Sequence, residues 1–130
     1  MSYEINWNSN YVSFDYFGEV TPEDIVESNK EVYGDERFDD LRWELVSFDK
    51  ADSVSFEPKQ VRIIAYMDEA AAISNPRITV AFIGHTKILE AVEAAYETSR
   101  AQQCWAILHF ESQEEALAHI EDSKGCSPSR

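Results

Sequence analysis

The sequence contains few of the residues that build disulfide scaffolds, phosphate-binding loops or membrane spans. Its 130 residues include two cysteines and four glycines. Neither cysteine has a histidine or another cysteine at metal-ligand spacing, which argues against a disulfide framework and against zinc. Four scattered glycines are too few to cradle phosphates, and no apolar run reaches the roughly 20 residues of a membrane span. We therefore expect no metal, no cofactor and no membrane insertion.

Basic residues are also scarce. The sequence has 11 lysines and arginines and 25 acidic residues, which gives a net charge of −14. This balance argues against nucleic acid or an anionic membrane as a partner. Residues 1–57 hold 15 acids and four bases, whereas residues 58–130 hold 10 acids and seven bases. If charge selects the partner, the N-terminal part should therefore make the contact. The alternative is that the acidic residues only form a solvated surface that aids solubility or suits a salty cytosol. Residues 1–10 lack the basic and apolar regions of a signal peptide, so we expect a cytoplasmic protein.

The apolar residues that are present follow strand and helix periodicities in alternation. Strands are expected at residues 3–7, 11–17, 41–48, 78–83 and 104–110. Helices are expected at residues 22–33, 58–73, 88–99 and 113–121. In this prediction Gly18 and Asp49 end the second and third strands, residues 50–57 form a loop, and Phe38 tucks onto the core from a charged loop.

The order β-β-α-β-α-β-α-β-α predicts a single α/β domain over residues 1–121. Strands that alternate with helices imply right-handed crossovers, so the sheet should be mixed and mostly parallel, with five strands. An N-terminal antiparallel hairpin should add the first strand, and four helices should cover the sheet. Residues 122–130 are polar and are expected to form a flexible C-terminal tail.

Four stretches, together with this element order, resemble the SpoIIAA-like proteins of the STAS group (sulfate transporter and anti-sigma-factor antagonist domains). They are Gly18–Asp24, Asp35–Phe38, Leu45–Asp49 and Trp105–Leu117. The resemblance implies a non-catalytic interaction module, and in the best-known members a serine in an Asp-Ser-Ser-Gly motif is phosphorylated at the start of the second helix. The corresponding segment here, residues 52–58, lacks the motif, although Ser53 and Ser55 lie in it. Some relatives are likened to lipid carriers of the Sec14 type.

In an open α/β sheet the ligand crevice lies beyond the carboxyl ends of the parallel strands. Exposed N–H groups at helix starts could bind a phosphate, a carboxylate or a phosphorylated serine there. The candidate partner- or anion-binding residues are Asp49, Ser53, Ser55, Gly84, His85, Thr86 and Ser112. The alternative is that Ser53, Thr86 and Ser112 only cap helices.

Catalysis and metal binding have weaker support. His85 paired with Asp49 could act as a hydrolase-like general base, but the sequence has no nucleophile elbow, so we expect no enzyme. Acidic pairs such as Asp35-Glu36 lack the spacing of a calcium loop.

Aromatic residues crowd the opening hairpin, at Tyr3, Trp7, Tyr11, Phe14, Tyr16 and Phe17. Rings exposed on one face of this edge would suggest a protein contact or a homodimer, whereas packing under the first helix would account for half of them. We therefore expect a non-catalytic, regulatory interaction domain with a protein partner, which binds through the hairpin, the acidic first helix and residues 49–58. The alternative function is a carrier of a small apolar ligand such as a lipid tail.

Overall fold

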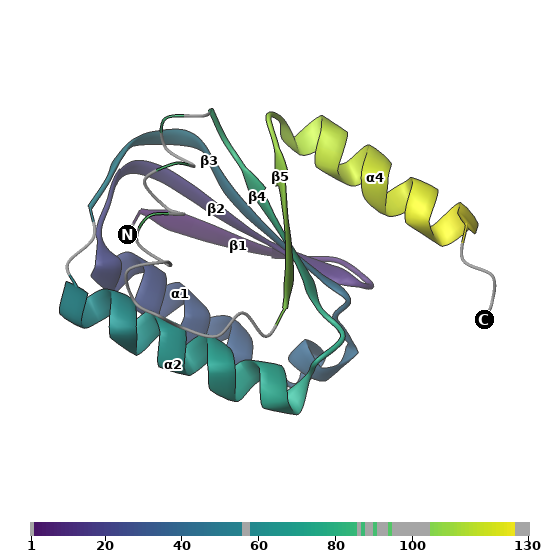
Figure 1. The fold of residues 1–130 in the computed structure, drawn as a ribbon, viewed down its shortest axis with the longest axis horizontal. Coiled ribbons are helices and arrows are strands. Elements are labelled where there is room, and N and C mark those ends of the chain that lie inside the picture. The colour runs from purple at the N-terminus through teal and green to yellow at the C-terminus, as the bar shows by residue number, and fades with distance from the viewer. Residues whose placement is uncertain are drawn as a thin grey trace.

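The protein folds around one mixed five-stranded sheet with the strand order β1-β2-β3-β4-β5 (Figure 1). The computed structural model describes residues 2–55, 58–85 and 105–126, and the single positions 87, 90 and 94. The strands are β1 (Tyr3–Trp7), β2 (Tyr11–Val20), β3 (Trp43–Val54), β4 (Thr79–Ile83) and β5 (Ala106–Phe110). The β1–β2 pair is antiparallel and the remaining pairs are parallel, as predicted.

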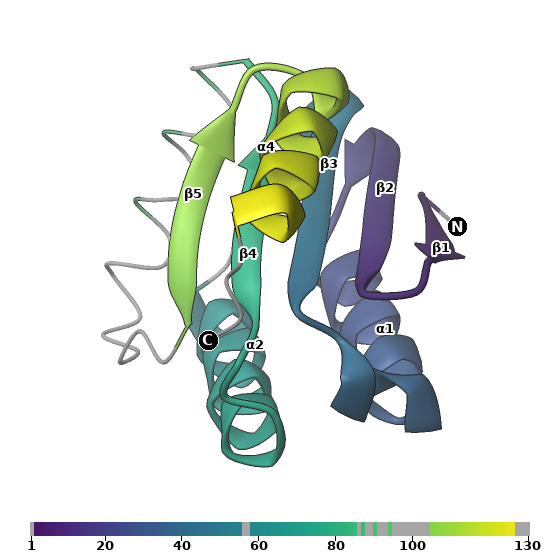
Figure 2. The same ribbon diagram turned by 90° about the vertical axis from the view of Figure 1, so that its right-hand side faces the viewer.

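Helices cover both faces of the sheet (Figures 1 and 2). Helices α1 (Pro22–Tyr33) and α2 (Pro58–Ser74) lie side by side on one face, and α4 (Gln113–Cys126) lies on the other against β3, β4 and β5. A short 3-10 helix, η1 (Glu36–Asp40), links α1 to β3. The described residues thus contain three of the four expected α-helices, because the predicted helix at residues 88–99 falls almost entirely outside them.

The larger core fills the space between the sheet and the α1–α2 layer. Phe14, Tyr16 and Phe48 form its centre, and the ring of Tyr16 stacks on that of Phe48 with centroids 5.2 Å apart. Phe38 is buried in this core, as expected, although it arrives from η1 and not from a loop. A smaller core under α4 consists of Leu45, Ala81, Ile83, Ala116 and Ile120. Strand β4 contributes to both cores, which explains why its sequence is apolar at nearly every position.

The first helix begins and ends where the sequence predicts. Thr21 caps it through its side chain, which accepts a hydrogen bond from the Asp24 N–H at 3.3 Å, and Asp24 accepts one from the Thr21 N–H at 3.0 Å. These reciprocal bonds form a capping box, which satisfies two of the helix's free N–H groups. Gly34 follows the last turn as the C-cap.

Two predicted strand ends are wrong. Strand β2 continues through Gly18 to Val20, and β3 continues through Asp49 to Val54, so most of the expected loop at 50–57 is strand. The two extensions pair with each other, with Gly18 opposite Ala51 and Val20 opposite Val54. Gly18 has a φ of 67°, and register shifts flank it. The glycine therefore bends the strand without ending it, because pairing with β3 supplies the backbone hydrogen bonds.

The C-terminal boundary also differs from the expected one. Helix α4 runs to Cys126, so residues 122–126 are helical and do not belong to a tail that starts at residue 122. Residues 127–130 and Cys104 lie outside the described residues.

Candidate functional site

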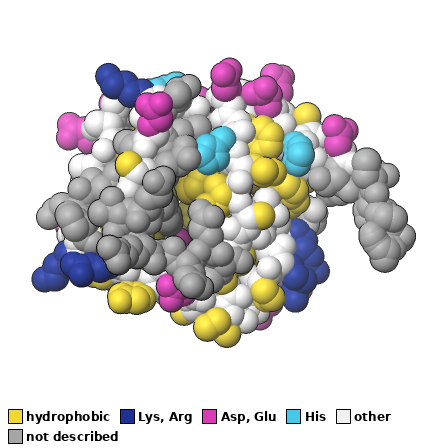
Figure 3. All heavy atoms as spheres, viewed as in Figure 1, with side chains coloured by type: hydrophobic (Ala, Val, Ile, Leu, Met, Phe, Trp, Pro, Cys, Tyr) yellow, Lys and Arg dark blue, Asp and Glu magenta, His cyan; other side chains and the backbone are white. Residues whose placement is uncertain are grey.

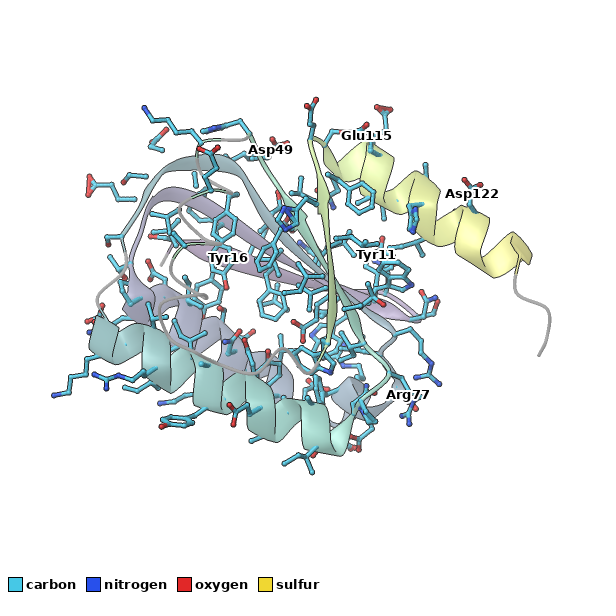
Figure 4. All side chains as sticks on the ribbon, in the orientation of Figure 1. Tyr11, Tyr16, Asp49, Arg77, Glu115 and Asp122 are labelled. Carbon is cyan, nitrogen blue, oxygen red and sulfur yellow. The ribbon has the colours of Figure 1, made fainter. Side chains whose placement is uncertain are left out.

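The carboxyl ends of β4 and β5 meet at one edge of the sheet, where β3 leaves β4 and where the sequence predicts a site. Ser47, Ile83 and Phe110 lie in register across the three strands, and the Gly84 N–H donates to the Phe110 carbonyl at 3.2 Å. Asp49 and Glu115 both lie at this upper edge (Figure 4). The structure therefore brings Asp49, Gly84, His85 and Ser112 to one edge, and Thr86 lies outside the described residues.

The structure separates Ser53 and Ser55 from that edge. Both are exposed, but Ser53 pairs with Glu19 on the extension of β2, and the Ser55 N–H donates to the Val20 carbonyl at 3.0 Å. They lie beside the N-terminus of α1, several residues beyond the point where β3 leaves β4. The prediction placed them at the edge because it treated residues 50–57 as a loop.

At the start of α4, side chains of the helix and its cap accept hydrogen bonds from backbone N–H groups. The Ser112 hydroxyl accepts a hydrogen bond from the Glu115 N–H at 3.2 Å, and the Glu115 carboxylate accepts one from the Glu111 N–H at 3.3 Å. Ser112 is thus a helix cap, the alternative that the sequence left open. The neighbouring carboxylates of Glu111, Glu114 and Glu115 make this helix start a poor place for an anion.

The pairing of His85 with Asp49 does not form in the described residues. Both side chains are exposed, and neither a hydrogen bond nor an ion pair joins them there. A general base needs an orienting partner within hydrogen-bond distance, so the described residues of this edge hold no assembled acid–base pair.

Asp35, the first acidic residue after α1, has a structural role. Asp35 caps η1 by accepting from the Arg37 N–H at 2.9 Å, and its carboxylate pairs with the Arg37 guanidinium at 2.8 Å. The hydrogen bonds from Arg37 lower the pKa of Asp35 to about 2. Arg37 also stacks over the Trp7 ring, with its guanidinium carbon 4.2 Å from the ring centroid. A hollow lined by Gly34–Arg37 lies here, and two of its charged side chains, Asp35 and Arg37, already bind each other.

The aromatic hairpin is mostly packed, so the expectation of several exposed rings is wrong. Phe14 and Tyr16 are buried, while Tyr3, Trp7 and Tyr11 are half-buried against the two cores. Phe17 is the one ring of this group that is exposed, at 42%. The four rings that pack into the larger core agree with the alternative of packing under the first helix. Tyr11 instead packs against the smaller core under α4.

Apart from Phe17, the large exposed hydrophobic residues in the described part of the chain lie on the outer face of α2. Ile63, Tyr66 and Ile73 are 45%, 67% and 84% exposed, and Ala70 between them is also exposed. Their spacing of three and four residues places them along one side of the helix, opposite the buried Ile64 and Ala71. We call Ile63, Tyr66, Ala70 and Ile73 the outer stripe. Figure 3 shows hydrophobic side chains along the lower edge of the molecule, over α2, with lysine and arginine near one end.

Sequence reasoning missed the outer stripe, although a signal was present. Positions 63, 66, 70 and 73 recur at helical spacing, as the inner positions do. Two apolar faces give α2 little amphipathic contrast, and the sequence pattern could not say which face would meet the sheet.

The described residues contain no group of three or more His, Cys, Asp or Glu side chains that could hold a metal ion. No helix in the part of the chain that the structure describes is long and apolar enough to cross a membrane.

Comparison with known proteins shows which fold the chain has. No protein-family model matches the chain, and no curated protein matches it. Among solved structures, the anti-sigma factor antagonist SpoIIAA in its unphosphorylated form aligns over 92% of this chain and 97% of its own, with a TM-score of 0.59 and 12% identity. The chain has a SpoIIAA-like fold.

Two further structures agree with this assignment. The phosphorylated form of SpoIIAA, a Bacillus cell fate determinant, covers 91% of this chain and 98% of its own, with a TM-score of 0.57 and 12% identity. An uncharacterized protein with a SpoIIAA-like fold from Shewanella loihica covers 91% of both chains, with a TM-score of 0.51 and 17% identity. The resemblance found in the sequence is confirmed for the fold, and at these identities the likeness extends to the fold alone.

Proposed function

We propose that the protein is a non-catalytic, regulatory interaction module whose partner protein docks on the outer stripe of α2. The observation that carries this proposal is the exposure of Tyr66 and Ile73 on the same side of one helix. Contiguous exposed apolar side chains on a folded domain are typical of protein interaction sites. The SpoIIAA-like fold supports the regulatory part, since SpoIIAA is described as an anti-sigma factor antagonist.

The charges beside the outer stripe indicate the chemistry of the partner. Lys59 and Arg62 are exposed at the N-terminal end of α2, in a chain with a net charge of −14. A partner surface that offers apolar side chains flanked by carboxylates would complement both features. This surface replaces the one expected from the sequence, because the hairpin rings are packed and most of residues 49–58 form a strand.

Site-specific crosslinking tests the docking surface. A photoreactive amino acid at Tyr66 should crosslink one defined protein in cells, whereas the same group at the exposed Ala118 on α4 should not. The double substitution Tyr66→Ser with Ile73→Ser should raise the Kd of the purified partner at least tenfold and leave the circular dichroism spectrum unchanged. Equal crosslinking from positions 66 and 118, or an unchanged Kd, would contradict the proposal.

Control by phosphorylation remains a separate part of the hypothesis. Ser53 and Ser55 are exposed and precede α2 closely in the sequence, but they lack the Asp-Ser-Ser-Gly motif of the best-known relatives. Replacing both serines by aspartate should lower the affinity for the captured partner if a phosphate at this position regulates docking. An unchanged affinity would remove phosphorylation from the function and leave the docking surface intact.

Carriage of a small apolar ligand has no comparable support among the described residues. The rings that could line such a site pack on one another, as Phe48 does on Tyr16 and, at 6.4 Å, on Phe82. Native mass spectrometry of the purified protein tests this alternative through any co-purified mass. Cytoplasmic location and a homodimer also stay predictions.

A further inference from the structure

A glutamate side chain is buried in the larger core. Glu44 lies on the central strand β3, between Val12 of β2 and Val80 of β4, and is only 3% exposed. Its Oε2 atom is buried and has no hydrogen-bond partner. An ionised carboxylate in such surroundings loses its hydration and gains little in return, so the neutral acid is favoured.

Two side chains from the covering helices join Glu44 to form a cluster. The hydroxyl of Tyr33, the last residue of α1, donates to Oδ1 of Asp68 on α2 at 2.8 Å. Burial raises the pKa of Glu44 well above its ordinary value, and the negative charge of Asp68 raises it further. The nearby Tyr33 hydroxyl acts in the opposite direction and is the smallest of the three effects. The sheet, α1 and α2 thus each contribute one polar side chain to the cluster.

No cation offsets these effects among the described residues. From β2, Tyr16 faces the same core; its hydroxyl bonds to the buried Ser28 at 2.6 Å, and burial raises the pKa of Tyr16. Strand β4 contributes only the apolar Val80 and Phe82 to this side of the sheet. On β5 the exposed His109 packs edge-on against Phe82, two strands away from Glu44.

We propose that Glu44, Tyr33 and Asp68 form a buried proton-binding site that fastens the α1–α2 layer to the sheet and loosens this layer when the proton leaves. The site stands apart from the docking surface, since it lies on the inner side of α2 and needs no partner. A raised pKa means that the folded state holds a proton that the unfolded state has already lost. The stabilisation is therefore complete below the unfolded-state pKa of about 4.3 and is lost as the pH rises through the folded-state pKa.

Denaturant unfolding over a range of pH tests the site. Across that interval, each pH unit should lower the folding equilibrium constant of the wild type by up to about tenfold more than that of Glu44→Gln, which carries no titrating group there. Glu4→Gln is the matched control, because Glu4 is exposed on β1 and the charge change is the same. Asp68→Asn should lower the upper end of this interval, because removing the neighbouring negative charge lowers the folded-state pKa of Glu44.

Infrared spectroscopy and hydrogen exchange supply readouts that do not require the variant at position 44 to fold. At a pH between the unfolded-state and folded-state pKa values, the folded wild type should show the C=O stretch of a protonated carboxylic acid, which Glu44→Gln removes and Glu4→Gln retains. As the band disappears at higher pH, amide exchange should accelerate in α1 and α2 before it does in α4. A wild type without the band would overturn the proposal, as would a band that survives in Glu44→Gln. Equal pH dependences of the wild type and Glu44→Gln would overturn it as well.

Discussion

Helix α2 carries apolar side chains on two opposite faces, and only one of them is covered. The inner face places Val61, Ile64 and Ala71 in the core against the sheet, whereas Tyr66 and Ile73 on the outer face meet solvent. The composition of the two faces is similar, but their physical roles differ. Burial on the inner face stabilises the domain, while the exposed face offers apolar area that only a partner can remove from water. The same chemistry thus supports the fold on one side of the helix and a proposed contact on the other.

The largest expected effect comes from a matched pair of neighbours on α2. Ile64→Ala should lower the free energy of unfolding by about 2–5 kcal/mol, because it leaves a cavity in the core. Ile63→Ala, with a side chain that is 45% exposed against 3% for Ile64, should cost far less. Urea denaturation of both variants checks this difference, and equal losses would mean that the two faces of α2 do not differ as described.

The next largest effect is expected where α2 ends. Asn75 is fully buried; its amide donates to the carbonyls of Phe38 and Leu41 at 2.8 and 2.9 Å. Asn75→Ala should lower the free energy of unfolding by about 2–3 kcal/mol, because both carbonyls lose a partner away from water. Thermal unfolding measures the loss. A variant as stable as the wild type would show that water replaces the amide.

A smaller effect is expected at the start of α1, which packs beside α2. Thr21→Ala removes the side-chain cap of the helix and should cost about 1 kcal/mol. Thr21→Ser, which keeps the hydroxyl, is the control and should recover most of that loss in the same denaturation experiment. If both variants lose the same amount, the methyl group and not the cap is responsible.

The smallest effect on stability is expected on the outer face itself. Ile73→Ser removes a side chain that is 84% exposed and should change the free energy of unfolding by no more than about 0.5 kcal/mol. The affinity of this variant for the partner should nevertheless fall. Denaturation and binding assays on one preparation can separate the effect on stability from the effect on binding. A large loss of stability would show that the outer stripe already packs against the chain's own residues.

Periodic segments could be predicted from the sequence, and residues whose surroundings are set by distant segments could not. The capping box at Thr21 and the apolar run of β4 are local patterns, and both were recognised. The continuation of β2 past Gly18 was missed because its hydrogen bonds come from β3, about 30 positions away in the sequence. The candidate edge was predicted in part: Asp49 and His85 reach it, but Ser53 and Ser55 follow the extended strand away from it.

The sequence by itself determined the order of the described strands and α-helices, the mixed sheet and the SpoIIAA-like fold, because these depend on hydrophobic period and chain order. Only the tertiary structure decided that most of the hairpin rings are covered, that α2 leaves an apolar face in solvent, and that Glu44 is buried in the core near Tyr33 and Asp68. The physical reason is that burial is a property of neighbours and not of a residue. The pattern of an alternating strand predicts that a glutamate faces solvent. Packing of the sheet against two helices is what removes the hydration of this carboxylate.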